Sequence, residues 1–156
     1  MTSMVLSKAC TYGILASFYV AREKDAAFVS IREMSEDLNI SFHFLTKILQ
    51  KLTADGIMIS HKGPKGGISL AKKPEKISLL EIIAAIDGDE IFHECILGLP
   101  GCGHEKPCPI HEYWASVRAE MESMFAHRTL AETAEGLEQI EYRLKLPVMS
   151  TRPPKL

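Results

Sequence analysis

The sequence predicts a mainly α-helical protein, a winged helix-turn-helix with a long C-terminal dimerisation helix. Two amphipathic patterns meet at the tight turn Asn39-Ile40-Ser41. A β-hairpin pattern around a glycine-rich turn at 63–67 follows them. After Pro109, apolar residues repeat with heptad-like spacing. These three observations carry the assignment.

Each helix of the first part has its own start or stop signal. Apolar residues of the segment 6–23 recur with a helical period. Ser30 lies three residues before Glu33, a capping-box pattern, and opens a short helix. That helix ends at Asn39, a residue type that tolerates the left-handed conformation. Ser41 then caps the next helix almost at once, which predicts a helix-turn-helix.

The hairpin is predicted by two runs rich in β-branched residues. The runs are 57–60 and 68–70, and the turn GPKGG separates them. A helix-turn-helix followed by a hairpin is a winged helix. Ser78 and Glu81 form a second capping box, so the segment SLLEIIAAIDG is expected to be helical.

A long helix is expected after Pro109, and one side of it carries a seam of apolar residues. The seam residues step by four, three, four and three positions. Such a seam fits either a helix lying on its own core or a helix that pairs with a second copy. Little chain remains to cover it, so we expect a homodimer. The seam comprises Ile110, Trp114, Val117, Met121 and Met124. A last short helix is expected from Thr129 and Glu132.

Composition indicates a folded cytoplasmic protein. Apolar residues make up 46% of the 156 positions and charged residues 24%, which is too hydrophobic for a disordered chain. No window approaches the roughly 18 uninterrupted apolar residues of a membrane span. The start MTSMVLSKAC lacks the ordered regions of a signal peptide. In a reducing cytosol, clustered cysteines more often indicate metal or redox chemistry than disulfides.

Positive charge is concentrated in the segment 41–76. It contains seven lysines and only two acidic residues, Asp55 and Glu75. Such a cluster can neutralise phosphates, and the N-terminal residues of a reading helix approach base edges. We therefore expect double-stranded DNA as a partner, and a dimer would read a palindrome-like operator. The expected contacts are Ser41, His43, Phe44, Thr46, Lys47, Lys51, Lys62 and Lys65.

Two aromatic side chains of the reading helix are assigned differently. Phe42 is expected to hold the helix on the core, together with the leucine and isoleucine residues of the same helix. Phe44 could lie on either the core or the DNA side, and both assignments stay open here.

The stretch ECILGLPGCGHEKPCPIHEYW, residues 94–114, concentrates soft metal ligands. Three of the four cysteines of the chain lie in it. Thiolates favour zinc, copper(I) or iron-sulfur clusters, and a histidine can replace one thiolate. The stretch lacks the tight C-x2-C pair common in zinc sites, and its glycines and prolines suit a group larger than one ion, so an iron-sulfur cluster is expected. The expected ligands are Cys95, Cys102, Cys108 and His111, with His104 and Cys10 as weaker candidates.

Alternatives to the cluster stay open at this point. The loop could instead bind a structural zinc ion or hold redox-active thiols. Cys108 is expected near the start of the long helix, where the helix dipole favours a thiolate. Cys10 lies on the apolar side of its helix, so it is either a small buried side chain or a ligand donated across a dimer.

These segments, in this order, resemble the bacterial winged-helix iron-sulfur transcription regulators of the IscR and NsrR type. The resemblance is carried by LSKACTYGILA, NISFHFLTKILQKL, GIMISHKGPKGGISLAK, ISLLEIIAAIDG and the three-cysteine loop. It implies a homodimeric DNA-binding repressor or activator whose cluster, 2Fe-2S before 4Fe-4S, senses redox state, nitric oxide or iron-sulfur status. A regulator with structural zinc or no metal is the alternative.

The resemblance also assigns residues. It makes Cys95, Cys102 and Cys108 the thiolate ligands and His111 the histidine ligand. The chain has Thr11 where members of the NsrR type have an acidic ligand, which argues against that ligand set.

No enzyme is expected, because the chain has no nucleotide-binding glycine motif, no C-x-x-C motif and no catalytic His/Asp/Ser arrangement. The expected division of the chain is a winged-helix DNA-binding domain at 1–77, a connecting helix with the cysteine-rich loop at 78–108, a dimerisation helix with a short terminal helix at 109–140, and a tail at 141–156.

Overall fold

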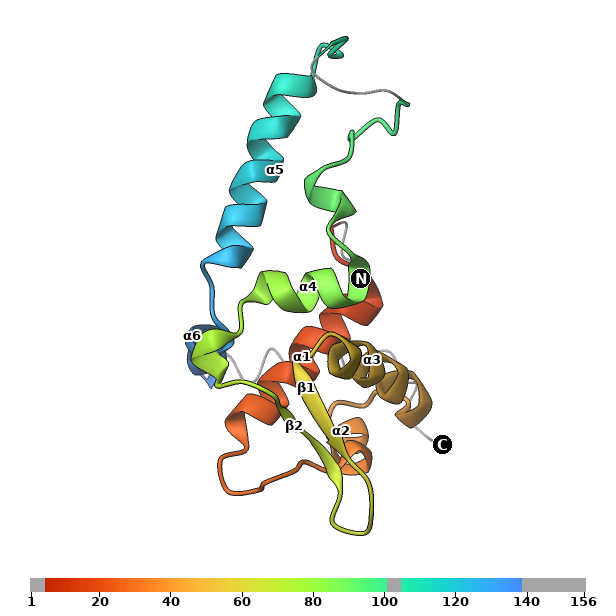
Figure 1. Ribbon diagram of the computed structural model, residues 1–156, viewed down its shortest axis with the longest axis vertical. Coiled ribbons are helices and arrows are strands. Elements are labelled where there is room, and N and C mark those ends of the chain that lie inside the picture. Colours follow the sequence, from red (N-terminus) through yellow and green to blue (C-terminus); the bar gives the residue numbers. More distant parts are fainter. Residues whose placement is uncertain (1–4, 101–104, 139–156) are drawn as a thin grey trace, which may run out of the picture.

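The computed structural model describes residues 5–100 and 105–138 (Figure 1). Cys102, His104 and the expected tail lie outside these residues. The α-helices are α1 (Lys8–Arg22), α2 (Ile31–Asp37), α3 (Phe42–Ala54), α4 (Leu79–Asp87), α5 (His111–Ala126) and α6 (Leu130–Glu138). Two strands, β1 (Met58–His61) and β2 (Gly67–Leu70), and two short 3-10 helices, η1 (Pro74–Lys76) and η2 (Glu90–Phe92), complete the fold. The expected mainly helical winged fold is confirmed.

The helix-turn-helix forms where its local signals predict it. The Ser30 hydroxyl accepts a hydrogen bond from the backbone N–H of Glu33, and the Ser41 hydroxyl accepts one from the N–H of Phe44. Between α2 and α3, Asn39 adopts a φ of 52°, in the left-handed region. The turn therefore reverses the chain without glycine, because asparagine tolerates this conformation.

The wing is an antiparallel hairpin that is extended by a neighbouring segment. Strand β1 pairs with β2 from Met58 opposite Leu70 to the end of the strands. Val29 adds an isolated bridge to Ile68, with N–H to O distances of 2.8 and 2.9 Å. A Cβ atom at Gly67 would lie 2.1 Å from the carbonyl oxygen of Val29, so only glycine lets the two backbones approach this closely.

One hydrophobic core connects the reading helix to the C-terminal part of the chain. Helix α1 packs against α3, α4 and α6, and the core includes Leu45, Leu49, Ile82 and Leu130. Helix α6 returns to the winged helix because the N–H of Leu130 donates to the carbonyl of Ile77 over 2.7 Å. We call residues 5–88 together with 127–138 the body.

Residues 89–100 and 105–126 form an arm that extends away from the body (Figure 1). Helix α5 is the long axis of the arm, and the segment that begins with η2 rises beside it. Phe92 of η2 meets Phe125 of α5 edge to face, with ring centroids 6.2 Å apart. None of the helices within the described residues has the length and apolar content needed to cross a bilayer.

Candidate nucleic-acid interface and metal site

The first turns of α3 present polar side chains to solvent. His43 and Lys47 are exposed there. Ser41 contributes its hydroxyl to the helix cap, and the Thr46 hydroxyl donates to the carbonyl of Phe42 over 2.7 Å. Both hydroxyl oxygens keep acceptor capacity for a DNA group. The surface therefore offers charge from Lys47 and hydrogen-bonding groups at the N-terminal end of the reading helix.

The two aromatic residues of α3 are arranged differently from the expectation. Phe42, expected on the core, is 45% exposed, and the guanidinium of Arg32 lies 5.2 Å from its ring centroid. Phe44 is half-buried and meets Tyr12 edge to face at 5.8 Å. The expectation for Phe42 was wrong because the helix starts at this residue, so its side chain lies beyond the packed face. Arg32 has no signal in the sequence that predicts its place on this surface.

Two of the basic side chains are engaged within the chain. The ammonium of Lys51 donates to the carbonyl of Ile86 over 3.3 Å, at the C-terminal end of α4, where the helix dipole favours a cation. Lys72 pairs with Glu81 at 2.5 Å. Burial alone would raise the pKa of Glu81, but hydrogen bonds from Lys72 and Ser78 outweigh it and hold the pKa below its usual value.

The turn of the wing carries two further lysines that the sequence predicts to contact DNA. Lys62 and Lys65 are exposed in the turn between β1 and β2. At the turn end of the hairpin, His61 stacks on Phe28 with ring centroids 4.7 Å apart. These contacts fix the end of β1, so the two lysines extend from a supported strand end.

The structure describes only part of the cysteine-rich loop. Cys95 and Cys108 are half-buried, and the described cysteines form no disulfide. His111 is 9% exposed, and its backbone N–H donates to the carbonyl of Cys108 over 3.0 Å. Within the described residues no three His, Cys, Asp or Glu side chains are placed to hold a metal ion. Two thiols outside any disulfide, and a buried histidine three residues after one of them in the chain, fit a soft-metal or iron-sulfur group by donor chemistry.

Cys10 is a fully buried thiol at the start of α1. Burial, assisted by the nearby carboxylate of Asp87 and a hydrogen bond to it, raises the pKa of Cys10 to about 12. The same carboxylate accepts hydrogen bonds from the backbone N–H of Ser7, over 2.8 Å, and from its hydroxyl. Asp87 thus joins the end of α4 to the N-terminus of α1, where the helix dipole favours a negative charge.

The segment before Cys95 is attached to α5 by side-chain hydrogen bonds. The indole N–H of Trp114 donates to the carbonyl of Glu94 over 2.9 Å. Arg118 donates from one guanidinium nitrogen to the same carbonyl over 2.8 Å, and also to the carbonyl of His93. Sequence reasoning missed Arg118, and placed Trp114 only in the seam.

The expected seam of α5 divides between two sides of the helix. Trp114 and Met121 are half-buried, and Trp114 contacts the segment after η2. The exposed side carries Ile110 (39%), Val117 (46%) and Met124 (51%), and Tyr113 at 77% joins them.

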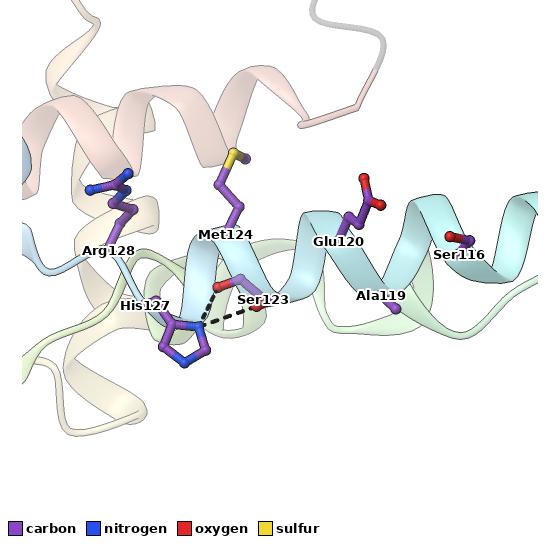
Figure 2. A pocket seen from close by; sticks show the side chains of 7 residues that line it. All are labelled: Ser116, Ala119, Glu120, Ser123, Met124, His127 and Arg128. Carbon is purple, nitrogen blue, oxygen red and sulfur yellow. Dashed lines mark hydrogen bonds between the residues drawn. The ribbon is translucent and has the colours of Figure 1, made fainter.

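A shallow groove of about 760 Å³ runs along one flank of α5 and into the turn after it (Figure 2). Ser116, Ala119, Ser123 and Met124 are among its lining residues. The ring of His127 lies against Ser123, with Nδ1 2.7 Å from its carbonyl oxygen, and closes the C-terminal end of the helix. Small side chains thus alternate along this flank with longer ones, Glu120 and Arg128.

Comparisons with known proteins agree with this arrangement. The Rrf2 family, described as iron-dependent transcriptional regulators, matches residues 6–136. An HTH-type transcriptional regulator of Aquifex aeolicus is 30% identical over 93% of this chain and 99% of its own length. IscR of Escherichia coli, also an HTH-type transcriptional regulator, is 28% identical over 88% of this chain and 85% of its own length.

Solved structures share the fold. CymR of B. subtilis, the global cysteine regulator, superposes with a TM-score of 0.71 at 22% identity and covers 85% of this chain and 98% of its own. IscR of T. potens gives a TM-score of 0.67 at 24% identity, over 87% of this chain and 90% of its own. The chain therefore belongs to the Rrf2 family: it is a DNA-binding winged-helix transcriptional regulator and not an enzyme.

Proposed function

We propose that the protein is a homodimeric cytoplasmic regulator whose DNA binding depends on an iron-sulfur cluster held by the cysteine-rich loop. The observation that carries the proposal is the attachment of this loop to α5 on both sides. The segment before Cys95 is hydrogen-bonded to Trp114 and Arg118, and Cys108 is bonded to the first residue of the helix. A change in the loop would therefore act directly on the helix that we assign to dimerisation.

The proposed ligands are Cys95, Cys102, Cys108 and His111, with a 2Fe-2S cluster favoured. When bound, the cluster would supply one-electron redox chemistry and sensitivity to oxidants or nitric oxide. The burial of His111 in the first turn of α5 limits the positions that its ring can adopt. Cys10 is fully buried in the core, which argues against a ligand from that position.

The proposed DNA surface is the start of α3 together with the wing. Ser41, His43 and Thr46 would approach base edges, Lys47 would reach a phosphate or a guanine edge, and Lys62 and Lys65 would contact phosphates. Arg32, beside exposed Phe42, lies at the same end of α3 and would add a phosphate contact. Lys51 instead supports α4, so we assign it a structural role.

A second copy of the chain is the proposed partner of the exposed side of α5. Ile110, Tyr113, Val117 and Met124 give this side an apolar surface that the described part of the chain leaves exposed. Two copies joined there would place two reading helices for the two halves of a palindrome-like operator.

The route from the loop to the reading helix is short in the structure. The segment of η2 continues from α4, whose last residues bind α1 through Asp87 and α3 through Lys51. A displacement of the loop would therefore reach the body at the end of α4. Sensing follows if the two loop states place the reading helices differently and so differ in DNA affinity.

The test combines metal analysis with DNA binding. Anaerobic purification of wild type and His111→Ala is followed by visible absorbance, iron and sulfide determination, and DNA affinity of apo, oxidised and reduced protein. We expect iron and sulfide in the wild type, an altered spectrum in the variant, and different DNA affinities between the forms. Equal affinities for all three forms would exclude the sensing role.

A regulator without a cluster is the second candidate. It is a winged-helix repressor with structural zinc or no metal, and the fold it needs is shared by CymR of B. subtilis, the global cysteine regulator. A colourless protein with stoichiometric zinc, or with no metal, would support this candidate.

A further inference from the structure

Two side chains of α5 act on the backbone at the entrance to the cysteine-rich loop. Trp114 and Arg118 are one helical turn apart, so their side chains emerge on the same side of α5. Both donate to the carbonyl of Glu94, the residue directly before Cys95, and Arg118 reaches the carbonyl of His93 as well. The two donors therefore hold two successive peptide groups.

These hydrogen bonds supplement a packing contact that already joins η2 to α5. Phe92 is 3% exposed and meets Phe125, two to three turns further along α5. That contact is enough to bring the two segments together, but it leaves the rotation of the following peptides open. The indole N–H and the planar guanidinium fix that rotation, because each hydrogen bond restricts the direction of the carbonyl that accepts it.

The far end of the loop is fixed on the same helix. The N–H of His111 donates to the carbonyl of Cys108, and the ring of His111 is nearly buried. The backbone next to Cys95 and the backbone of Cys108 are thus both hydrogen-bonded to the first two turns of α5. Ligands are held at a useful separation when such supporting groups lock the backbone that carries them.

We propose that Trp114 and Arg118 are positioning residues of the cluster site, which set the place of Cys95 relative to α5. The inference rests on the proposed function, since it assigns these side chains a role toward a group that the loop would hold. They touch no ligand atom, and they act through the carbonyls of His93 and Glu94. Loss of either donor should leave the fold intact and make the site hold its cluster less tightly.

The test uses full-length protein reconstituted anaerobically with iron and sulfide. The variants are Trp114→Phe, which keeps an aromatic ring and removes the N–H, and Arg118→Met, which keeps the stem and removes the guanidinium. Arg118→Lys can donate to one carbonyl and serves as partial rescue. Arg128→Met and Arg128→Lys are the matched controls for the two Arg118 variants, because the Arg128 side chain is exposed just after α5.

The readouts are iron and sulfide per chain, the visible circular dichroism of the cluster, and the half-life of cluster loss to a chelator. Supporting groups of metal sites commonly contribute 10- to 100-fold in affinity, so we expect loss about 10-fold faster in Trp114→Phe and Arg118→Met with changed visible circular dichroism. Arg118→Lys should fall between these variants and the wild type. The controls should match the wild type, and far-ultraviolet circular dichroism should be unchanged throughout.

Each outcome decides one question. A wild-type protein that takes up no iron and sulfide overturns the proposed function and this inference with it. A wild-type cluster whose spectrum and half-life persist in both donor variants overturns the positioning role alone. Loss of helical signal in Arg118→Met would assign Arg118 a structural role, and Trp114→Phe then decides the inference by the same two readouts.

Discussion

The body and the arm differ in how far each buries its own apolar surface. In the body, side chains such as Leu45, Leu52 and Ile82 are fully buried around α1. In the arm, His111 is the sole buried residue of α5. Most of the large apolar side chains that stay exposed within the described residues lie in the arm, namely Ile96, Leu97, Leu99, Ile110, Tyr113, Val117 and Met124. The body therefore buries its own apolar side chains, whereas the arm leaves an apolar surface exposed, which is typical of a binding surface.

The largest expected effect is in the core of the body. Leu45→Ala should lower the free energy of unfolding by about 2–5 kcal/mol, because Leu45 is fully buried and its removal leaves a cavity. The matched change in the arm, Leu97→Ala, affects a side chain that is 55% exposed. It should change the free energy of unfolding by less than about 0.5 kcal/mol. Urea unfolding measures both. Equal losses would mean that the arm is packed as tightly as the body.

The next effect is on association and not on folding. Val117→Glu places a carboxylate on the exposed apolar side of α5, and burying it unpaired in a dimer would cost several kcal/mol. Association should weaken at least about 100-fold, which light scattering over a concentration series would detect.

Ala126→Glu is the control for this change. Ala126 is exposed and lies on the other side of α5 by helical periodicity. The Ala126→Glu variant should remain a dimer, and both variants should keep the thermal stability of the body. A dimer that persists in Val117→Glu would place the partner surface elsewhere.

The seam shows what sequence could and could not predict. Caps and turns were predictable because their signals are local: Ser78 and Glu81 form the expected reciprocal cap, and Asn39 adopts the expected conformation. The heptad-like stripe lies on a helix, but its period does not distinguish the side chains that pack on their own chain from those that stay exposed. Trp114 and Val117 therefore belong to different sides although they share one repeat.

Contacts with backbone carbonyls were hidden from the sequence for a related reason. Every residue has a carbonyl, so no residue pattern indicates that Lys51 would bind Ile86 or that Arg118 would bind Glu94. The same holds for the pairing of Lys72 with Glu81, because it needs two elements to be packed together first. Charge counting predicted the basic surface, and tertiary structure decided which lysines belong to it.

A smaller effect concerns the buried thiol of the body, Cys10, and the pH dependence of the free energy of unfolding. The folded protein raises the pKa of Cys10 to about 12 from an ordinary 9.0, so folding holds the thiol proton more tightly. This stabilisation is complete below about pH 9 and is lost as the pH rises toward 12. Urea unfolding of wild type and Cys10→Ala at several pH values should give a difference that falls above pH 9. A constant difference would show that the buried thiol does not contribute to the pH dependence.

The smallest effect tests the charge of the body alone. Lys62→Ala removes an exposed wing ammonium, and if Lys62 contacts a phosphate, the slope of log affinity against log salt should fall by about 0.9. Lys72→Ala is the matched control, because the Lys72 ammonium is already paired with Glu81. This substitution should leave the slope nearly unchanged. Fluorescence anisotropy with an operator fragment at several salt concentrations measures both slopes. If Lys72→Ala lowered the slope as much as Lys62→Ala, the ion pair with Glu81 would have to open on DNA, and the basic surface would extend toward α4.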